Sequence, residues 1–131
     1  MIVYGNEDTN AVAKSLLEGS SVRIRRGSLT VGERTLEGDD LSLLMVRPKY
    51  PQVNGLRDAL LDKEQFAIVG GTGLAGMRST DTMPYFVSGV HYPDLFVYDS
   101  RIHTIGSKAV RVAGVFGNDW SVEKGDIVWR D

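Results

Sequence analysis

Apolar runs of strand length alternate along this chain with polar stretches that contain glycine or carry helix-like spacing. Six segments read as strands: Ile2 to Tyr4, Leu41 to Val46, Phe66 to Val69, Leu95 to Tyr98, Val110 to Phe116 and, at an edge, Ile127 to Trp129. The run at 41–46 is almost continuously apolar, which is typical of a strand buried on both faces. Strand-like segments that alternate with helix-like ones favour an α/β domain.

A short amphipathic helix is predicted after the first strand. Its apolar side chains share one helical face at Val12, Ala13, Leu16 and Leu17. The N-cap is expected at Asp8, Thr9 or Asn10, and Gly19 is expected to end the helix in a left-handed conformation. Further along, Arg47 to Asn54 contains two prolines and is predicted to be a loop, and Leu56 to Leu61 is predicted to be a short helix.

The stretch from residue 22 to residue 36 has a different pattern, typical of antiparallel strands. Val22 and Ile24 alternate with arginines, and Gly32-Glu33 marks a tight turn before Arg34 to Leu36. The sequence as a whole therefore predicts one α/β domain over residues 1–131. We expect a three-layer, Rossmann- or flavodoxin-like fold with a mainly parallel sheet, and an antiparallel hairpin around residues 22–36.

The most informative motif is the junction at which Phe66 to Val69 leads into Gly70-Gly71-Thr72-Gly73-Leu74-Ala75-Gly76. Glycines at G-x-G-x-x-G spacing permit a tight turn and a close approach of the backbone to a phosphate. The amides that open the following helix would add partial positive charge. A carboxylate about 20 residues further on would suit a ribose. The candidate ligand-binding residues are Gly71, Thr72, Gly73, Gly76, Arg78 and Asp99.

Two observations weaken a nucleotide-binding interpretation of this motif. A P-loop needs Lys and then Ser or Thr after its last glycine, and Met77 and Arg78 stand there instead. Pro84 interrupts the helix that a dinucleotide site requires. The chain holds 15 glycines, so the spacing also fits a loop that merely turns a strand into a helix.

Composition narrows the classes of function. The 131 residues suffice for one core, and the formal net charge of −2 gives no electrostatic case for nucleic acid or an anionic membrane as partner. No apolar stretch reaches the length of a membrane helix, and no signal peptide is visible in this chain. The absence of cysteine excludes disulfides, thiolate metal sites and cysteine nucleophiles.

No catalytic or metal-binding constellation is predicted, and no cofactor is implied. A zinc site would have to recruit loop residues from a small set: His91, Asp94, Asp99 and His103. No G-x-S-x-G elbow occurs. Acidic residues in loops are interpreted as turn and cap residues: Asp8, Asp39 and Asp40. Five arginines are interpreted as a solvated sheet face, with an anion-binding face as the alternative: Arg23, Arg25, Arg26, Arg34 and Arg47.

Several of these segments together carry a resemblance to a known group of proteins. They are Met1 to Asn10, Val22 to Gly27, Leu41 to Pro48, Val69 to Leu74, Leu95 to Val97 and Gly114 to Trp120. In this order they resemble the C-terminal region of large bacterial α/β-hydrolase-type proteins, the prolyl-oligopeptidase-like peptidases and esterases. The resemblance covers most of the chain and rests on fold-level patterns, without a catalytic signature.

The resemblance implies a noncatalytic accessory domain, excised from a longer multidomain protein, that packs on or assists the hydrolase domain of the same polypeptide. In such proteins the serine elbow and histidine lie in that separate domain, so no catalytic residue carries over to this chain. A periplasmic or extracellular location is implied as well. The alternative function is a small-molecule or nucleotide-binding Rossmann-like domain that uses Gly71 to Gly76. Homo-oligomerisation is left open.

Overall fold

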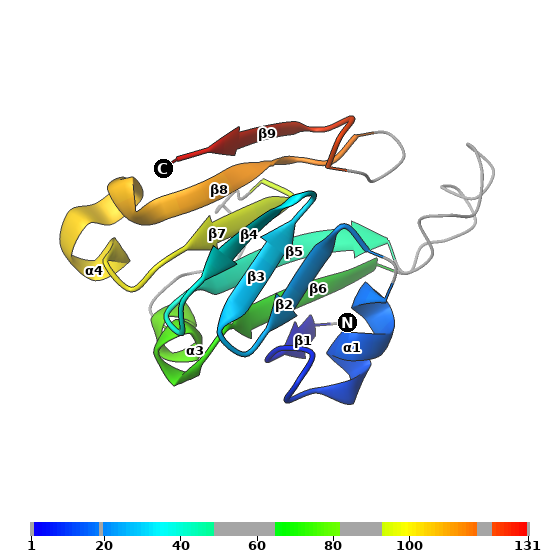
Figure 1. Ribbon diagram of the computed structural model, residues 1–131, viewed down its shortest axis with the longest axis horizontal. Helices are drawn as coiled ribbons and strands as arrows, with labels where there is room; N and C mark the ends of the chain where they lie inside the picture. Colours follow the sequence, from blue (N-terminus) through cyan, green and yellow to red (C-terminus); the bar gives the residue numbers. More distant parts are fainter. Residues whose placement is uncertain (1, 19, 49–64, 82–92, 118–121, 131) are drawn as a thin grey trace.

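The computed structural model describes residues 2–18, 20–48, 65–81, 93–117 and 122–130. Within these ranges the chain forms a six-stranded mixed sheet and a three-stranded antiparallel sheet. Strands contain 43% of the residues and helices 23%, so the described part of the chain is mainly β-structure. Figure 1 shows the smaller sheet lying across the front of the larger one.

The prediction of a mainly parallel, Rossmann- or flavodoxin-like fold is wrong. The larger sheet has the order β1 (Ile2–Tyr4), β6 (Gln65–Gly71), β5 (Ser42–Pro48), β7 (Leu95–Tyr98), β8 (Val110–Val115) and β9 (Asp126–Trp129). Only β1 and β6 are parallel neighbours, and the four other pairs of adjacent strands are antiparallel. A continuous apolar run reports burial on both faces but not strand direction. Here one face is covered by a second sheet instead of a layer of helices.

The second sheet is the antiparallel element predicted around residues 22–36. It consists of β2 (Val22–Arg25), β3 (Ser28–Val31) and β4 (Arg34–Glu37). Gly27 and Gly32 lie in its two tight turns with φ of 77° and 62°, where residues with a side chain are disfavoured. The alternation of the strands buries one face, at Val22, Ile24, Leu29 and Val31.

The main core lies between the two sheets. The buried face of the small sheet packs against Leu43, Met45, Phe66 and Ile68 of the central strands of the large sheet. A smaller cluster on the other face of the large sheet contains Leu44, Val69 and Tyr98. The guanidinium of Arg34 on β4 lies 4.1 Å from the ring centroid of Trp129 on β9, which ties the outer strands of the two sheets together.

The predicted N-terminal helix is confirmed as α1 (Ala11–Leu17), and it buries Ala13 and Leu17. Asn10 is its N-cap, because the side-chain oxygen accepts hydrogen bonds from the amides of Val12 and Ala13. The predicted helix end at Gly19, the predicted helix at Leu56 to Leu61, and Pro84 lie outside the described residues.

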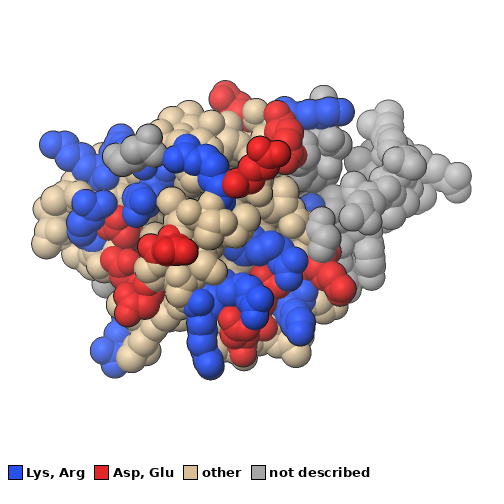
Figure 2. Space-filling model, viewed as in Figure 1, with Lys and Arg blue, Asp and Glu red and all other residues tan. Residues whose placement is uncertain are grey.

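Three other helical segments are described: α3 (Leu74–Thr80), α4 (Ile102–Ile105) and a 3₁₀ helix, η1 (Gly106–Ala109). Strand β5 continues through Arg47 and Pro48, so the loop predicted for Arg47 to Asn54 does not begin at Arg47, and the rest of that segment lies outside the described residues. Within the described ranges no helix has both the length and the apolar character needed to cross a bilayer. Figure 2 shows acidic and basic side chains interspersed over the viewed face, without a single basic field.

Candidate functional site

The glycine loop joins a strand to a helix, as predicted. Strand β6 ends at Gly71, and α3 begins at Leu74 with Gly73 as its N-cap. Strands β6 and β7 both run antiparallel to β5, which lies between them, so β6 and β7 are parallel to each other. The chain therefore passes from β6 through α3 to a parallel strand two positions away in the sheet.

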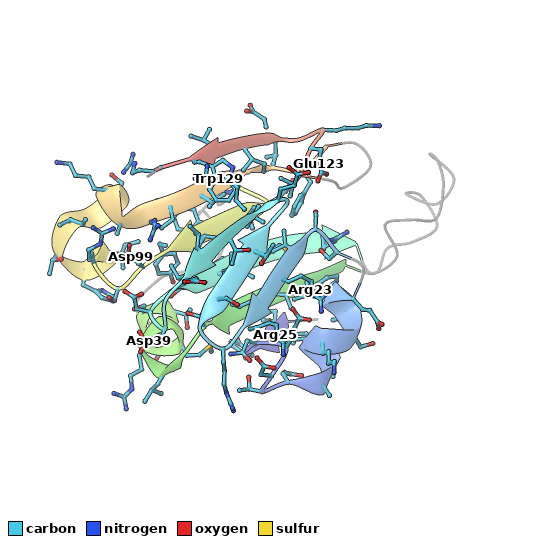
Figure 3. All side chains as sticks on the ribbon, viewed as in Figure 1. Arg23, Arg25, Asp39, Asp99, Glu123 and Trp129 are labelled. Carbon is cyan, nitrogen blue, oxygen red and sulfur yellow. The ribbon has the colours of Figure 1, made fainter. Side chains whose placement is uncertain are left out.

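The structure places the glycine loop and Asp99, the two parts of the predicted ligand site, at the same edge of the sheet, where strands β6 and β7 end. Ser42 at the start of β5 pairs with Gly71 on one side and with Tyr98 on the other. Asp99, which follows Tyr98, thus lies at the same edge as the glycine loop. Figure 3 shows Asp99 and Asp39 toward the same end of the sheet. This edge holds the carboxyl ends of two parallel strands, where open α/β sheets bind ligands.

The glycine loop itself is filled by the protein's own backbone. A Cβ on Gly76 would lie 2.2 Å from the carbonyl oxygen of Leu41, and a Cβ on Gly73 would lie 2.6 Å from that of Asp39. A Cβ on Gly71 would lie 2.4 Å from the amide nitrogen of Met77. The close backbone approach that the glycines permit is therefore made by the segment from Asp39 to Leu41 and by the start of α3.

Hydrogen bonds fix this segment in place. The amide of Thr72 donates to the Leu41 carbonyl at 3.0 Å, and the Leu41 amide donates to the Thr72 hydroxyl at 3.2 Å. The amide of Gly76 donates to the Asp39 carbonyl at 3.3 Å. A pyrophosphate would have to displace these contacts to reach the amides of Thr72 and Gly76. Arg78 lies exposed on α3. The geometry thus favours the interpretation of the motif as a strand-to-helix turn.

Asp99 is engaged by arginines of the chain. Its buried carboxylate accepts hydrogen bonds from the Arg101 amide and Nε, both at 3.0 Å, and from Arg101 Nη2 at 2.7 Å. Arg111 Nη1 lies 3.7 Å away. The side-chain hydrogen bonds from Arg101 lower the pKa of Asp99 below its ordinary value, although burial acts in the opposite direction. Asp99 therefore stabilises the start of α4, and a ribose would compete with two guanidinium groups for it.

The turn before β5 is tied to this region as well. Asp40 accepts a hydrogen bond from the Ser100 hydroxyl at 2.7 Å and one from the Ser100 amide at 3.3 Å. No group of three or more histidine or acidic side chains suited to a metal ion occurs in the parts of the chain described. Of the four residues considered for zinc, His91 lies outside those parts, and Asp94 accepts a hydrogen bond from the Phe116 amide at 3.2 Å.

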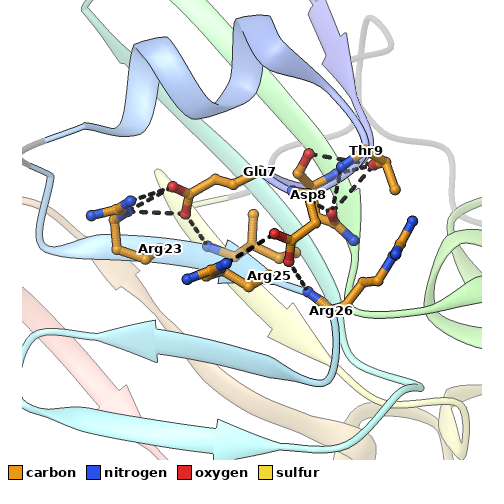
Figure 4. A network of polar contacts seen from close by, with 8 residues as sticks. Glu7, Asp8, Thr9, Arg23, Arg25 and Arg26 are labelled. Atoms are coloured by element: carbon orange, nitrogen blue, oxygen red, sulfur yellow. Dashed lines mark hydrogen bonds and ion pairs between the residues drawn. The ribbon is translucent and has the colours of Figure 1, made fainter.

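A second polar cluster joins the first loop to the small sheet (Figure 4). The buried carboxylate of Glu7 accepts hydrogen bonds from the Arg23 side chain and, at 3.1 Å, from the Ile24 amide. The carboxylate of Asp8 accepts from Arg25 Nη2 at 3.0 Å and from the Arg26 amide at 2.9 Å.

The interpretation of the arginines as a solvated face holds for Arg25, Arg26 and Arg34, which are exposed. Arg23 is partly buried against Glu7, and Arg47 is buried.

The hydrogen bond from Arg25 lowers the pKa of Asp8, and hydrogen bonds to the acidic partners raise the pKa of Arg23 and of Arg25. Asp8 lies in a turn, as expected, and its carboxylate also holds the β2–β3 turn. The alternation of arginines in β2 was visible in the sequence, but their acidic partners come from a loop 16 or 17 residues earlier in the chain.

Comparison with known proteins identifies no relative. No family model, curated protein or solved structure matches this chain. The resemblance to hydrolase-associated domains therefore stands on the sequence segments alone, and the function has to be argued from the geometry.

Proposed function

We propose that this chain is a noncatalytic accessory domain that packs against another domain of its own polypeptide, a serine hydrolase domain of the exported peptidase or esterase type. The resemblance of the sequence to hydrolase-associated domains indicates the class of the partner domain. The observation that carries the proposal is an apolar row on the face of the large sheet that points away from the small sheet.

The row crosses all six strands. Strand registers place six apolar residues side by side, in the order Tyr4, Val69, Leu44, Phe96, Ala113 and Val128. The middle of the row is buried at Val69 and Leu44, whereas Tyr4 is 50% and Val128 65% exposed. Ile2 and Val115, two residues along β1 and β8, are also exposed on the same face.

Exposed apolar side chains that continue a buried row favour contact with a further protein surface. Burial of such area contributes about 25 cal/mol per Å². The exposed residues of the row lie on the two outer strands, on either side of its buried middle, and a neighbouring domain that contacts both strands would cover them. The candidate nucleotide site gives no comparable support, because the backbone of Asp39 to Leu41 lies against the glycine loop.

The proposal implies a longer polypeptide, and a comparison with it provides the test. Hydrogen exchange is compared between this chain alone and the polypeptide that includes the neighbouring region. We expect slower exchange in β1 and β9 of the longer polypeptide. The double variant Tyr4→Lys with Val128→Lys should remove that protection, whereas Ser15→Lys, on the exposed side of α1, should retain it. Equal exchange in both forms, or a neighbouring region without a hydrolase domain, would contradict the proposal.

The noncatalytic part of the proposal has its own assay. The isolated chain should give no turnover of p-nitrophenyl esters or aminoacyl-nitroanilides above a heat-denatured control. Turnover that disappears on mutation of one serine or histidine of this chain would identify it as an enzyme.

A further inference from the structure

Strand β9 forms an edge of the large sheet whose outer side no described element covers. It is the last strand in the sheet order and pairs with β8, and Figure 1 shows it as the outermost strand. The strand contains neither proline nor lysine, and its register with β8 runs on without a bulge. Natural sheets use proline, lysine, bulges or a covering segment to block such edges. The outer side of β9 is therefore open to pairing with another strand.

The hydrogen bonds between β8 and β9 show which backbone groups point outward. The Arg130 amide donates to the Arg111 carbonyl at 2.8 Å, so these two residues form a hydrogen-bonded pair. Such pairs alternate along an antiparallel ladder, so the backbone groups of Val128 also point toward β8. The amides and carbonyls of Ile127 and Trp129 consequently point away from β8. Within the described residues, no turn or loop forms a hydrogen bond with them.

The side chains of β9 and of the next residue divide between two faces. Ile127 and Trp129 are partly buried and pack against the main core. Asp126, Val128 and Arg130 are exposed on the opposite face, where Val128 ends the apolar row. An acidic and a basic side chain thus flank the exposed valine, each two positions away from it.

We propose that β9 pairs antiparallel with β9 of a second copy of this chain, about a two-fold axis at Val128. Ile127 then lies opposite Trp129 of the second copy, and their outward backbone groups form hydrogen bonds. Val128 lies opposite Val128, and Asp126 lies opposite Arg130 of the second copy. These last pairs are non-hydrogen-bonded ones, in which the side chains are closest. One surface serves both copies, as a two-fold interface requires.

Charge complementarity selects a second copy as the occupant of this edge. Opposite charges directly across two antiparallel strands attract, and like charges repel. The proposed pairing contains the Asp126–Arg130 contact twice, whereas a parallel, in-register pairing of two copies would oppose like charges. Arg130 Nη1 already donates to the Ser107 carbonyl at 2.6 Å. The remaining N–H groups of its guanidinium are left to donate to the carboxylate of the second copy.

The edges of the small sheet do not offer this match. The outer side of β2 is taken by the first loop, because the Glu7 amide donates to the Ile24 carbonyl at 2.9 Å. On β4, the backbone groups of Thr35 and Glu37 point outward. Two copies paired antiparallel along that edge would oppose residues an even number of positions apart, so Arg34 would never face Glu37.

This inference does not rest on the proposed function. The pairing uses backbone groups in the plane of the sheet, whereas the neighbouring domain is proposed to cover side chains on its face. A strand of four residues buries little area, so we expect a weak dimer with a Kd on the order of 100 µM. At low micromolar concentrations the chain is then mainly monomeric, and protection by a neighbouring domain is measured without the pairing.

Sedimentation equilibrium of the whole chain with charge variants provides the test. The wild type should dimerise reversibly as its concentration rises. Asp126→Arg and Arg130→Asp each oppose like charges, and each should weaken self-association about tenfold. An equimolar mixture of the two variants should associate as tightly as the wild type, because a basic edge then faces an acidic one. Glu123→Arg makes a similar change at an exposed turn before β9 and should dimerise as the wild type does.

Two results of this experiment would overturn the proposal. One is a wild-type chain that stays monomeric up to about 1 mM. The other is a mixture that associates no more tightly than either variant alone.

Amide exchange in the wild-type chain gives a second readout that needs no variant. It is measured by NMR at one concentration below the Kd and one above it. The amides of Ile127 and Trp129 should exchange more slowly at the higher concentration, because they donate to the second copy. The amide of Val128 points toward β8 and should change less. Unchanged rates for Ile127 and Trp129 in a sample that dimerises would show that the copies associate elsewhere, and would refute the assignment.

Discussion

Gly76 and Leu41 approach so closely that a Cβ on Gly76 would lie 2.2 Å from the Leu41 carbonyl oxygen. The contact joins the first turn of α3 to the residue before β5, two segments 35 positions apart in the sequence. It explains why a glycine stands at a buried position in a helix, where alanine would otherwise be preferred. The glycine spacing that predicts a phosphate site is used here for packing between two parts of the same chain.

Gly76→Ala should destabilise the protein. The added methyl group has to displace backbone at Leu41, and overpacking of this kind costs about 1–3 kcal/mol. The intrinsic helix preference of alanine acts in the opposite direction, so a net loss reports the clash. Urea unfolding measures the free energy of unfolding. Leu74→Ala, at a 67% exposed position in the same helix, is the control and should change it by less than about 0.5 kcal/mol. An unfolding free energy of Gly76→Ala equal to that of wild type would refute the packing role.

Dinucleotides and nucleotides should not bind at the glycine loop. NAD, NADP, FMN and ATP are titrated into the wild-type chain by calorimetry, because a bulky substitution at Gly73 would clash with Asp39 and unfold the loop regardless of any ligand. Micromolar binding, corresponding to roughly 8 kcal/mol, would contradict the expectation. Its loss in Arg78→Ala, an exposed position, would then place the nucleotide at this loop.

Glu7→Gln should destabilise the contact between the first loop and the small sheet. The change weakens the charged hydrogen bonds to Arg23 and to the Ile24 amide, and we expect a loss of about 1–3 kcal/mol. Glu33→Gln makes the same chemical change at an exposed turn and should have almost no effect. Chemical unfolding of both variants checks this, and equal stabilities would show that the Glu7 contacts contribute nothing.

Asp99 should make the stability of the protein depend on pH in the acidic range. Its pKa is lower in the folded state than the ordinary value of 3.8, so the folded state favours the ionised form. The resulting stability is fully present above about pH 4 and is lost as the pH falls through the folded-state pKa. Asp99→Asn should be less stable than wild type at pH 7 and should lose less stability on acidification. Thermal unfolding from pH 7 to pH 2.5 measures both effects. Asp126→Asn, at an exposed edge position, is the control.

The local sequence pattern was sufficient to predict most of the individual helices and strands. The alternation in residues 22–36 identified an antiparallel hairpin with a tight turn at Gly32. The helix at Ala11–Leu17 followed from one apolar face, and Phe66 to Val69 was identified as a strand that leads through a glycine loop into a helix. These features depend on residues within a few positions of one another. Side-chain periodicity and turn chemistry act over that distance, so a single sequence reveals them.

Tertiary structure decided the direction and neighbours of the strands, because apolar runs such as Leu41 to Val46 report burial but not the identity of the covering layer. The tertiary structure also decided the role of the glycines in the loop. The sequence establishes that Gly71, Gly73 and Gly76 permit a close backbone approach, and only the fold shows that Asp39 to Leu41 makes that approach. The partners of Asp99 were hidden for the same reason: electrostatic contacts join residues through space, and their pairing depends on how the strands are arranged.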